Sequence, residues 1–234
     1  MPIIVSPSTP VATALLTSYA ELVAALDIYL GRSDSSTIAD YLIAEAEAEM
    51  NARLRVRRML TSLVPTVSGT GSVTIPADFG GWKRFSAVNG GVARDLALLT
   101  AESQRDIQRT TSMPGTPKAV ITLGAASQVW PYGDSNWTYE ALYFARIPNL
   151  NAVDDTNWVI LVHPVAYLYG CLAAARGYAS DEKVDLWEKR FDRAVERIEE
   201  EDSLETNASD HAILAPNTSL FGGGGAYNVL TDGR

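Results

Sequence analysis

The sequence contains few of the residue types that most often carry chemistry. Its 234 residues include one cysteine, Cys171, and two histidines, His163 and His211. A lone cysteine forms no disulfide within its chain, and its place in the small-residue run 169–173 predicts a buried thiol. His163 stands directly before a proline and is interpreted as a turn residue. Because no His, Cys, Asp and Glu stand at metal-ligand spacing, we expect no metal site, no cofactor and no histidine-based catalysis.

Positive charge and long apolar runs are also scarce. The chain has 19 Lys and Arg against 28 Asp and Glu, and its formal net charge is -9. An acidic surface repels phosphate backbones, so we do not expect tight binding of duplex DNA. No stretch reaches the ~18 uncharged apolar residues of a membrane span. No basic cluster precedes the modest apolar stretch 11–16, which argues against a signal peptide.

The glycine-rich segments give no phosphate site. Residues 68–71 and 222–225 contain neither a lysine nor a following helix start, so they are interpreted as a turn and as part of a tail. Carboxylates are numerous, which leaves a glycosidase-type pair open. Nothing in the sequence places two of them across a cleft.

Apolar residues at helical spacing predict two helices near the start of the chain. Ser18 can cap a first helix that ends before Gly31, and a longer helix is expected from about 37 to 58. Acidic residues gather toward the start of the second helix and arginines toward its end, as the helix dipole favours. The apolar stripe of the second helix consists of Ile38, Leu42, Ala46, Met50 and Leu54.

A second helix pair is predicted near the end of the chain. One helix begins at Pro164 and presents Val165, Leu168, Tyr169 and Leu172 on one face, with small residues on the other. Small residues let a second helix approach closely, so we expect a helical hairpin with the segment that follows Ser180. The acidic run 199–202 opposes the dipole at the end of that helix, whose last turn should fray. The stripe of the later helix consists of Val184, Trp187, Phe191, Ala194, Val195 and Ile198.

The middle of the chain changes to the pattern of strands and turns. We predict a hairpin of 60–67 with 72–75, and a second of 82–88 with 92–96 in which Asn89-Gly90 supplies both positive-φ turn residues. A short helix is expected at about 100–110. Strands follow at 119–123, 127–130 and 138–145. The last has apolar residues on both sides, which favours a sheet covered on both faces.

These segments predict an α+β fold, mainly a helical bundle of two N-terminal and two C-terminal helices with a β-rich middle layer and extended arms. The expected divisions are an N-terminal arm 1–17, a main domain 18–202 and a C-terminal tail 203–234. The main domain comprises a helix pair 18–59, a β-rich insertion 60–150 and a helix pair 164–202. Sparse apolar residues in the tail suit docking on a neighbour. The expected interface residues are Leu214, Leu220, Phe221, Tyr227, Val229 and Leu230.

Three stretches, taken in order, resemble a known family. The first is 18–30 followed by 38–59, with a Leu-hydrophobic-Ala-Glu-Ala-Glu core at 42–47 and Arg-Leu-Arg-Val-Arg at 53–57. The second is Val-Thr-Ile-Pro-Ala-Asp-Phe at 73–79. The third is 142–150, then 156–159 and 167–170, closing on Leu186-Trp187. Over about 19–198 the chain resembles the head-to-tail adaptor proteins of tailed bacteriophages, although both arms are longer than the family norm.

The resemblance implies a structural virion protein and not an enzyme. Such an adaptor forms a ring of usually about twelve copies at the neck, between the portal protein and a tail, nozzle or stopper protein. It is made in the host cytoplasm. Genome DNA passes through its channel during packaging and ejection without specific binding, which an acidic wall suits. We expect the tail after Ser203 to dock on the portal or on a neighbouring subunit. The alternatives are a virion-associated peptidoglycan hydrolase and a bacterial assembly module unrelated to phage.

Overall fold

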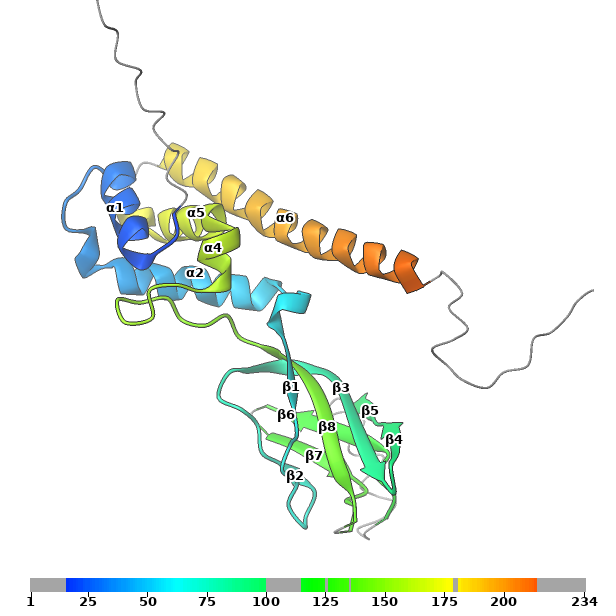
Figure 1. Cartoon of the computed structure of the whole chain (residues 1–234). Helices are drawn as coiled ribbons and strands as arrows, with labels where there is room; N and C mark the ends of the chain where they lie inside the picture. The colour runs from blue at the N-terminus through cyan, green and yellow to red at the C-terminus, as the bar shows by residue number, and fades with distance from the viewer. Residues whose placement is uncertain (1–15, 100–114, 125, 135, 179–180, 214–234) are drawn as a thin grey trace, which may run out of the picture.

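The computed structural model describes residues 16–99, 115–124, 126–134, 136–178 and 181–213. These form a helical part and a separate part built from two β-sheets (Figure 1). The helices are α1 (Tyr19–Leu30), α2 (Ala39–Arg53), α4 (Trp158–Val162), α5 (Pro164–Ala174) and α6 (Asp181–Ile213). The strands are β1 (Leu60–Leu63), β2 (Ser72–Val73), β3 (Phe79–Asn89), β4 (Val92–Asp95), β5 (Ala97–Leu99), β6 (Ala119–Leu123), β7 (Ala126–Trp130) and β8 (Thr138–Ala145).

The first helix begins and ends where the sequence predicts. The Ser18 hydroxyl accepts a hydrogen bond from the backbone N–H of Glu21, and Gly31 closes the helix in the left-handed conformation at φ 64°. Helix α2 is shorter than the predicted 37–58 and ends at Arg53. Leu54 is extended, and Leu54 and Val56 are both buried, so the chain follows the two-residue period of extended backbone here.

Helix α5 lies at the centre of the helical part and is buried from Ala166 to Ala173. Its neighbours are α1, α2, α4 and α6. The predicted face of Val165, Leu168, Tyr169 and Leu172 is not uniform in burial, because Val165 is 52% exposed whereas the other three are buried. A helix that is covered on nearly all sides has no single apolar face, so periodicity cannot assign its buried residues.

The predicted hairpin of the last two helices is confirmed by the packing of α5 on α6. The apolar stripe of α6 faces this contact, with Val184, Trp187, Phe191, Val195 and Ile198 buried. Gly170 makes the close approach possible. A Cβ atom at that position would lie 2.9 Å from the Cβ of Ala46 in α2 and 3.1 Å from a ring carbon of Phe191 in α6.

Helix α6 continues well beyond its predicted end near residue 202. It runs to Ile213, so neither fraying at 199–202 nor a tail that begins at 203 agrees with the structure. Arg57 accounts for part of the difference. Its backbone N–H and its guanidinium donate to Asp202, at 2.9 Å and 3.2 Å, and the guanidinium also reaches Glu205 at 2.6 Å. The positive charge of Arg57 thus offsets the negative charges of Asp202 and Glu205 in the second half of α6, where the helix dipole disfavours anions.

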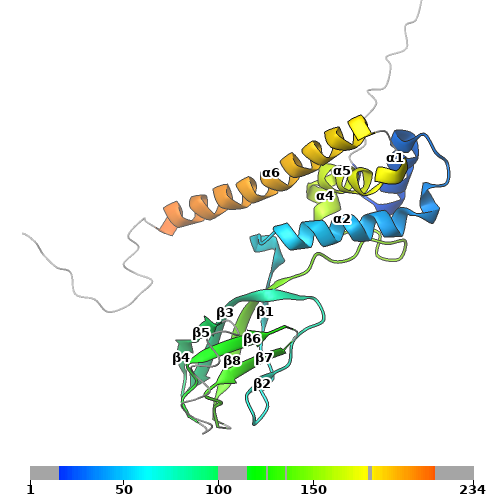
Figure 2. The same cartoon turned by 180° about the vertical axis from the view of Figure 1, so that it is seen from behind.

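The β-rich middle is a pair of facing sheets. One sheet has the strand order β1-β8-β3-β4, and the other has β2-β7-β6-β5. All pairs are antiparallel except β5 with β6. The sheets share a small core separate from that of the helices. Figure 2 shows from behind that the sheets and the helices form two separate parts. This core consists of Val73, Phe85, Ala87, Leu96, Val120, Val129, Tyr139 and Ala141.

The strand pairing corrects three predictions. Strand β1 pairs with β8 and β2 with β7, so the first predicted hairpin survives only as a turn closed by the bridge between Val67 and Val73. The second hairpin is present, but its positive-φ residues are Gly90 and Gly91, at 58° and 81°, and Asn89 belongs to β3. Strand β8 is buried on one face only, since Glu140 on the other is exposed.

Several predictions fall outside the described residues. These are the arm up to residue 15, the helix at 100–110 and the tail from 214 onward, which contains all six expected interface residues.

Candidate functional site

A buried polar network links α2, α4 and α5 to the segment that returns from the β-sheets. The Glu47 carboxylate accepts hydrogen bonds from the backbone N–H of Leu150 and from the Tyr167 hydroxyl, both at 2.8 Å. The Asn157 amide donates to that hydroxyl at 2.5 Å and to the carbonyl of Pro148 at 2.7 Å. The side-chain oxygen of Asn157 also caps α4. The network therefore fixes the return segment 146–157 against the helices.

The electrostatics of this network are those of a buried structural contact. Burial raises the pKa of the Glu47 carboxyl, although its hydrogen bonds from Leu150 and Tyr167 lower it in part. Burial and the nearby Glu47 raise the pKa of the Tyr167 hydroxyl. Glu47 is 5% exposed, and one of its oxygens already accepts two hydrogen bonds. A carboxyl held in this way is suited to fastening two segments together and not to proton transfer with a substrate.

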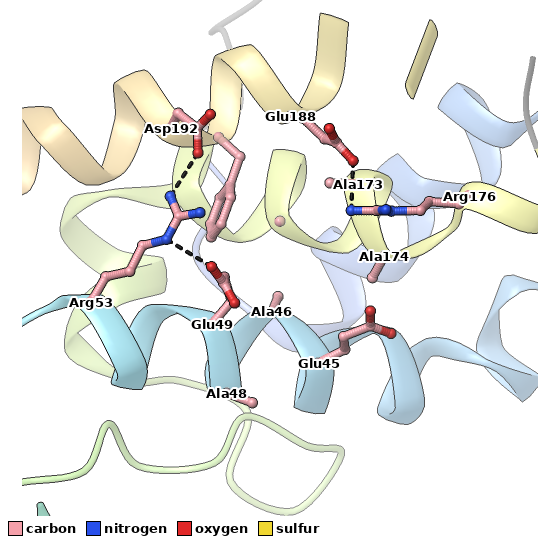
Figure 3. A pocket seen from close by; sticks show the side chains of 12 residues that line it. Glu45, Ala46, Ala48, Glu49, Arg53, Ala173, Ala174, Arg176, Glu188 and Asp192 are labelled. Atoms are coloured by element: carbon pink, nitrogen blue, oxygen red, sulfur yellow. Dashed lines mark hydrogen bonds and ion pairs between the residues drawn. The ribbon is translucent and has the colours of Figure 1, made fainter. Parts of the chain in front are cut away.

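A first surface groove lies between α2, α5 and α6, and arginines engage three of its four carboxylates (Figure 3). Arg53 lies 2.7 Å from Glu49 in its own helix and 2.6 Å from Asp192 in α6. Arg176 lies 2.6 Å from Glu188. Exposed ion pairs of this kind contribute at most about 1 kcal/mol each to stability. The Arg53–Asp192 pair joins α2 to α6, and these ion pairs leave no opposed pair of carboxyls of the glycosidase kind among the described groove residues.

A second groove, between the α4–α5 junction and α6, is apolar with a basic edge. Val162 and Val165 are 44% and 52% exposed within it. The edge consists of Arg190, Arg193 and Arg197, which recur at helical spacing along α6. Arg190 donates to the Tyr169 hydroxyl, and Arg197 pairs with Glu201 within its helix at 2.9 Å. An exposed apolar floor beside cationic side chains is typical of a protein-binding surface.

His163 lies at this second groove, in the turn between α4 and α5, as the sequence predicts. Burial lowers the pKa of its imidazole, and the Glu201 carboxylate 3.8 Å away opposes that shift. His211 belongs to the end of α6. Cys171 is buried, as expected, and burial raises the pKa of its thiol. Within the described ranges, no three His, Cys, Asp or Glu side chains come together as metal ligands. Nor do those ranges contain a helix long and apolar enough to cross a membrane.

Comparison with known proteins also indicates a structural protein. The family model described as SU10 adaptor protein matches residues 17–214. The chain belongs to the SU10 adaptor protein family. The match includes every described helix and strand of the adaptor, and it confirms the resemblance to phage head-to-tail adaptors. No curated protein matches this adaptor in sequence.

Family membership makes the adaptor a structural component of a phage virion, a kind of protein that contacts other virion proteins. The contact residues predicted from the sequence all belong to the tail, and neither groove was predicted. The sequence does contain a pattern that could have indicated the basic edge of the second groove, because Arg190, Arg193 and Arg197 lie on one helical face. No sequence pattern indicated the apolar floor, since Val162 and Val165 belong to an apolar segment in which every residue is expected to be buried.

Proposed function

We propose that the adaptor is one subunit of a ring of about twelve copies that lies at the virion neck, between the portal protein and the tail, nozzle or stopper protein. The ring lines the channel through which the genome enters and leaves the head. The observation that carries this proposal is the family match, which extends over 17–214 and so includes both the helical part and the β-sheets. The match therefore covers every described helix and strand.

The charge of the chain supports a role beside passing DNA. A formal net charge of -9 lowers adhesion of a polyanion to the channel wall. The genome then slides past without specific binding. The fold adds a rigid wall, because the central helix α5 is buried among four other helices.

The tail from residue 214 onward is the proposed contact with the portal or with a neighbouring subunit, through Leu214, Leu220, Phe221, Tyr227, Val229 and Leu230. Because α6 extends to Ile213 and Arg57 holds it at Asp202 and Glu205, the informative truncation ends at Ile213 and not at Ser203. Loss of portal binding with an unchanged fold is the expected result. Portal binding at full strength by the truncated chain would remove the tail from the interface.

The direct test is cryo-electron microscopy of the neck of purified virions. We expect a ring of this chain directly against the portal. Density elsewhere in the particle, or none, would overturn the proposal. A turbidity assay on cell-wall suspensions addresses the alternative of a peptidoglycan hydrolase, and we expect no clearing. Clearing of the suspension by the purified chain would favour the peptidoglycan hydrolase over the adaptor ring.

A further inference from the structure

Two exposed faces of the helical part are complementary in charge. The first is the groove with the apolar floor of Val162 and Val165 and the edge of Arg190, Arg193 and Arg197. The second is an exposed face of α2, and its residues Glu45, Ala48 and Glu49 also line the first groove. We call them the basic groove and the acidic ridge. The ridge consists of Asp40, Tyr41, Ala44, Glu45, Ala48 and Glu49, all of which are exposed.

The acidic ridge is an exposed helix face with few partners among the described residues: the Tyr19 hydroxyl donates to Asp40 at 2.9 Å, and Glu49 pairs with Arg53 at 2.7 Å. Tyr41, at 70% exposure, is a large aromatic side chain in water. Ala44 and Ala48 follow it one and two turns later, and small residues at that spacing let another surface come close to the backbone. In Figure 3 the Ala48 side chain points to the side of α2 away from α5 and α6. Glu45 forms no ion pair among the residues that the structure describes.

The basic groove offers matching groups. Its exposed valines can cover an aromatic ring, and aromatic anchors in apolar pockets dominate many protein interfaces. Arg193 and Arg197 are four residues apart on α6, as Glu45 and Glu49 are on α2, so the two rows of charges share one helical period. Arg193, like Glu45, has no ion-pair partner in the described part of the chain. Among the described residues that line this groove, Glu201 is the one carboxylate, and Arg197 already pairs with it.

We propose that the acidic ridge of one subunit docks in the basic groove of the next subunit around the ring. This inference rests on the proposed ring and names the surfaces that close it. A two-fold contact of either face with its own copy would set like charges against each other, which is unfavourable. Contact between the two different faces pairs opposite charges, and when each subunit uses its two faces on two different neighbours the contact is head-to-tail, the kind that generates rings.

The test uses full-length chains incorporated into virions. A chain that carries both Tyr41→Cys and Val165→Cys is treated in purified particles with a bismaleimide of about 10 Å span, close to the distance between packed helices. We expect a ladder of multimers on a denaturing gel, because each subunit is linked at both faces. Chains with only one of the two cysteines should remain monomeric. Cys171 is buried in the native subunit, so it contributes no cross-link.

Charge reversal provides a second readout in the same particles. Arg193→Glu and Glu45→Arg should each lower incorporation into virions about tenfold, as a like-charge contact disfavours assembly. The two changes combined in one chain should restore it. Arg94→Glu, on exposed strand β4, is the matched control and should incorporate normally.

The outcomes separate the pairing of faces from the ring itself. A ring at the neck without a ladder, together with normal incorporation of Arg193→Glu, would overturn the proposed contact and leave the ring in place. Absence of both the ring and the ladder would overturn the proposed function and this contact together. A ladder that stops at dimers would also refute it, since that pattern indicates a two-fold contact.

Discussion

Glu47 is the residue at which the structure makes its sharpest prediction about stability. In Glu47→Ala, the Leu150 N–H and the Tyr167 hydroxyl lose the acceptor that each reaches at 2.8 Å. Leaving a buried donor without an acceptor costs about 1–3 kcal/mol, so the loss of both acceptors should lower the free energy of unfolding by roughly 2–6 kcal/mol. For a chain of this size the melting temperature should fall on the order of 10 °C.

Glu47→Gln should behave differently, because its side-chain oxygen can still accept both hydrogen bonds and no charge is buried. We expect its free energy of unfolding at about pH 7 to lie within roughly 1 kcal/mol of the parent value. Burial raises the pKa of Glu47 above 4.5, so the folded chain holds this proton more tightly than the unfolded chain. The contribution of Glu47 to stability is therefore complete at lower pH and is lost as pH rises through the raised pKa.

The assay is urea denaturation of the parent, Glu47→Ala and Glu47→Gln chains at several pH values from about pH 4 to about pH 8. From about pH 4.5 upward, the parent should lose stability relative to Glu47→Gln until the raised pKa is passed. The reasoning would be refuted if Glu47→Gln were destabilised as much as Glu47→Ala at neutral pH. It would also be refuted if the difference between the parent and Glu47→Gln did not change with pH.

Two further predictions concern helix packing. Gly170→Ala should lower the free energy of unfolding by about 1–3 kcal/mol, since the new methyl group would collide with α2 and α6. In the control Gly177→Ala, the new methyl group would have no other atom within 4 Å, so this variant should melt at the parent temperature or slightly above. Equal melting curves for both would contradict this account. Arg57→Ala removes the ion pairs with Asp202 and Glu205, worth roughly 1 kcal/mol together, so amide exchange around Asp202 should speed up about fivefold. Arg197→Ala removes only a pair within α6 and should change that exchange less. Unaltered amide exchange in Arg57→Ala would show that the end of α6 is stable without Arg57.

Features that depend on neighbouring residues were predictable from the sequence. Ser18 and Gly31 mark the ends of α1 because a cap acts within one turn. The stripe of α6 was readable because one side of that helix faces the core and the other faces solvent. Strand β8 has its predicted bounds, 138–145, for a similar reason, since one of its faces is buried and the other is not.

Features that depend on distant residues were not predictable. The Tyr167 hydroxyl meets Glu47 across 120 residues of sequence, and no local pattern specifies that contact. The length of α6 was underestimated because its stabilising cation, Arg57, belongs to a segment 145 residues away. The two-sheet arrangement was missed for the same reason, as β1 pairs with β8 and not with its neighbour in sequence. The grooves are products of this long-range packing, so they could not be located from the sequence.

The adjacency of β1 and β8 also bears on how the chain reaches its native state. Leu60 lies opposite Phe144, so the whole β-rich insertion leaves and rejoins the helical part at neighbouring points (Figure 1). Closing a flexible loop of that length costs about 4 kcal/mol of chain entropy. If the sheets form first, α2 and α5 no longer have to find each other through a long random search. Folding of the insertion then holds α2 and α5 near each other, which lowers the entropy cost of forming the helical core and so speeds its formation.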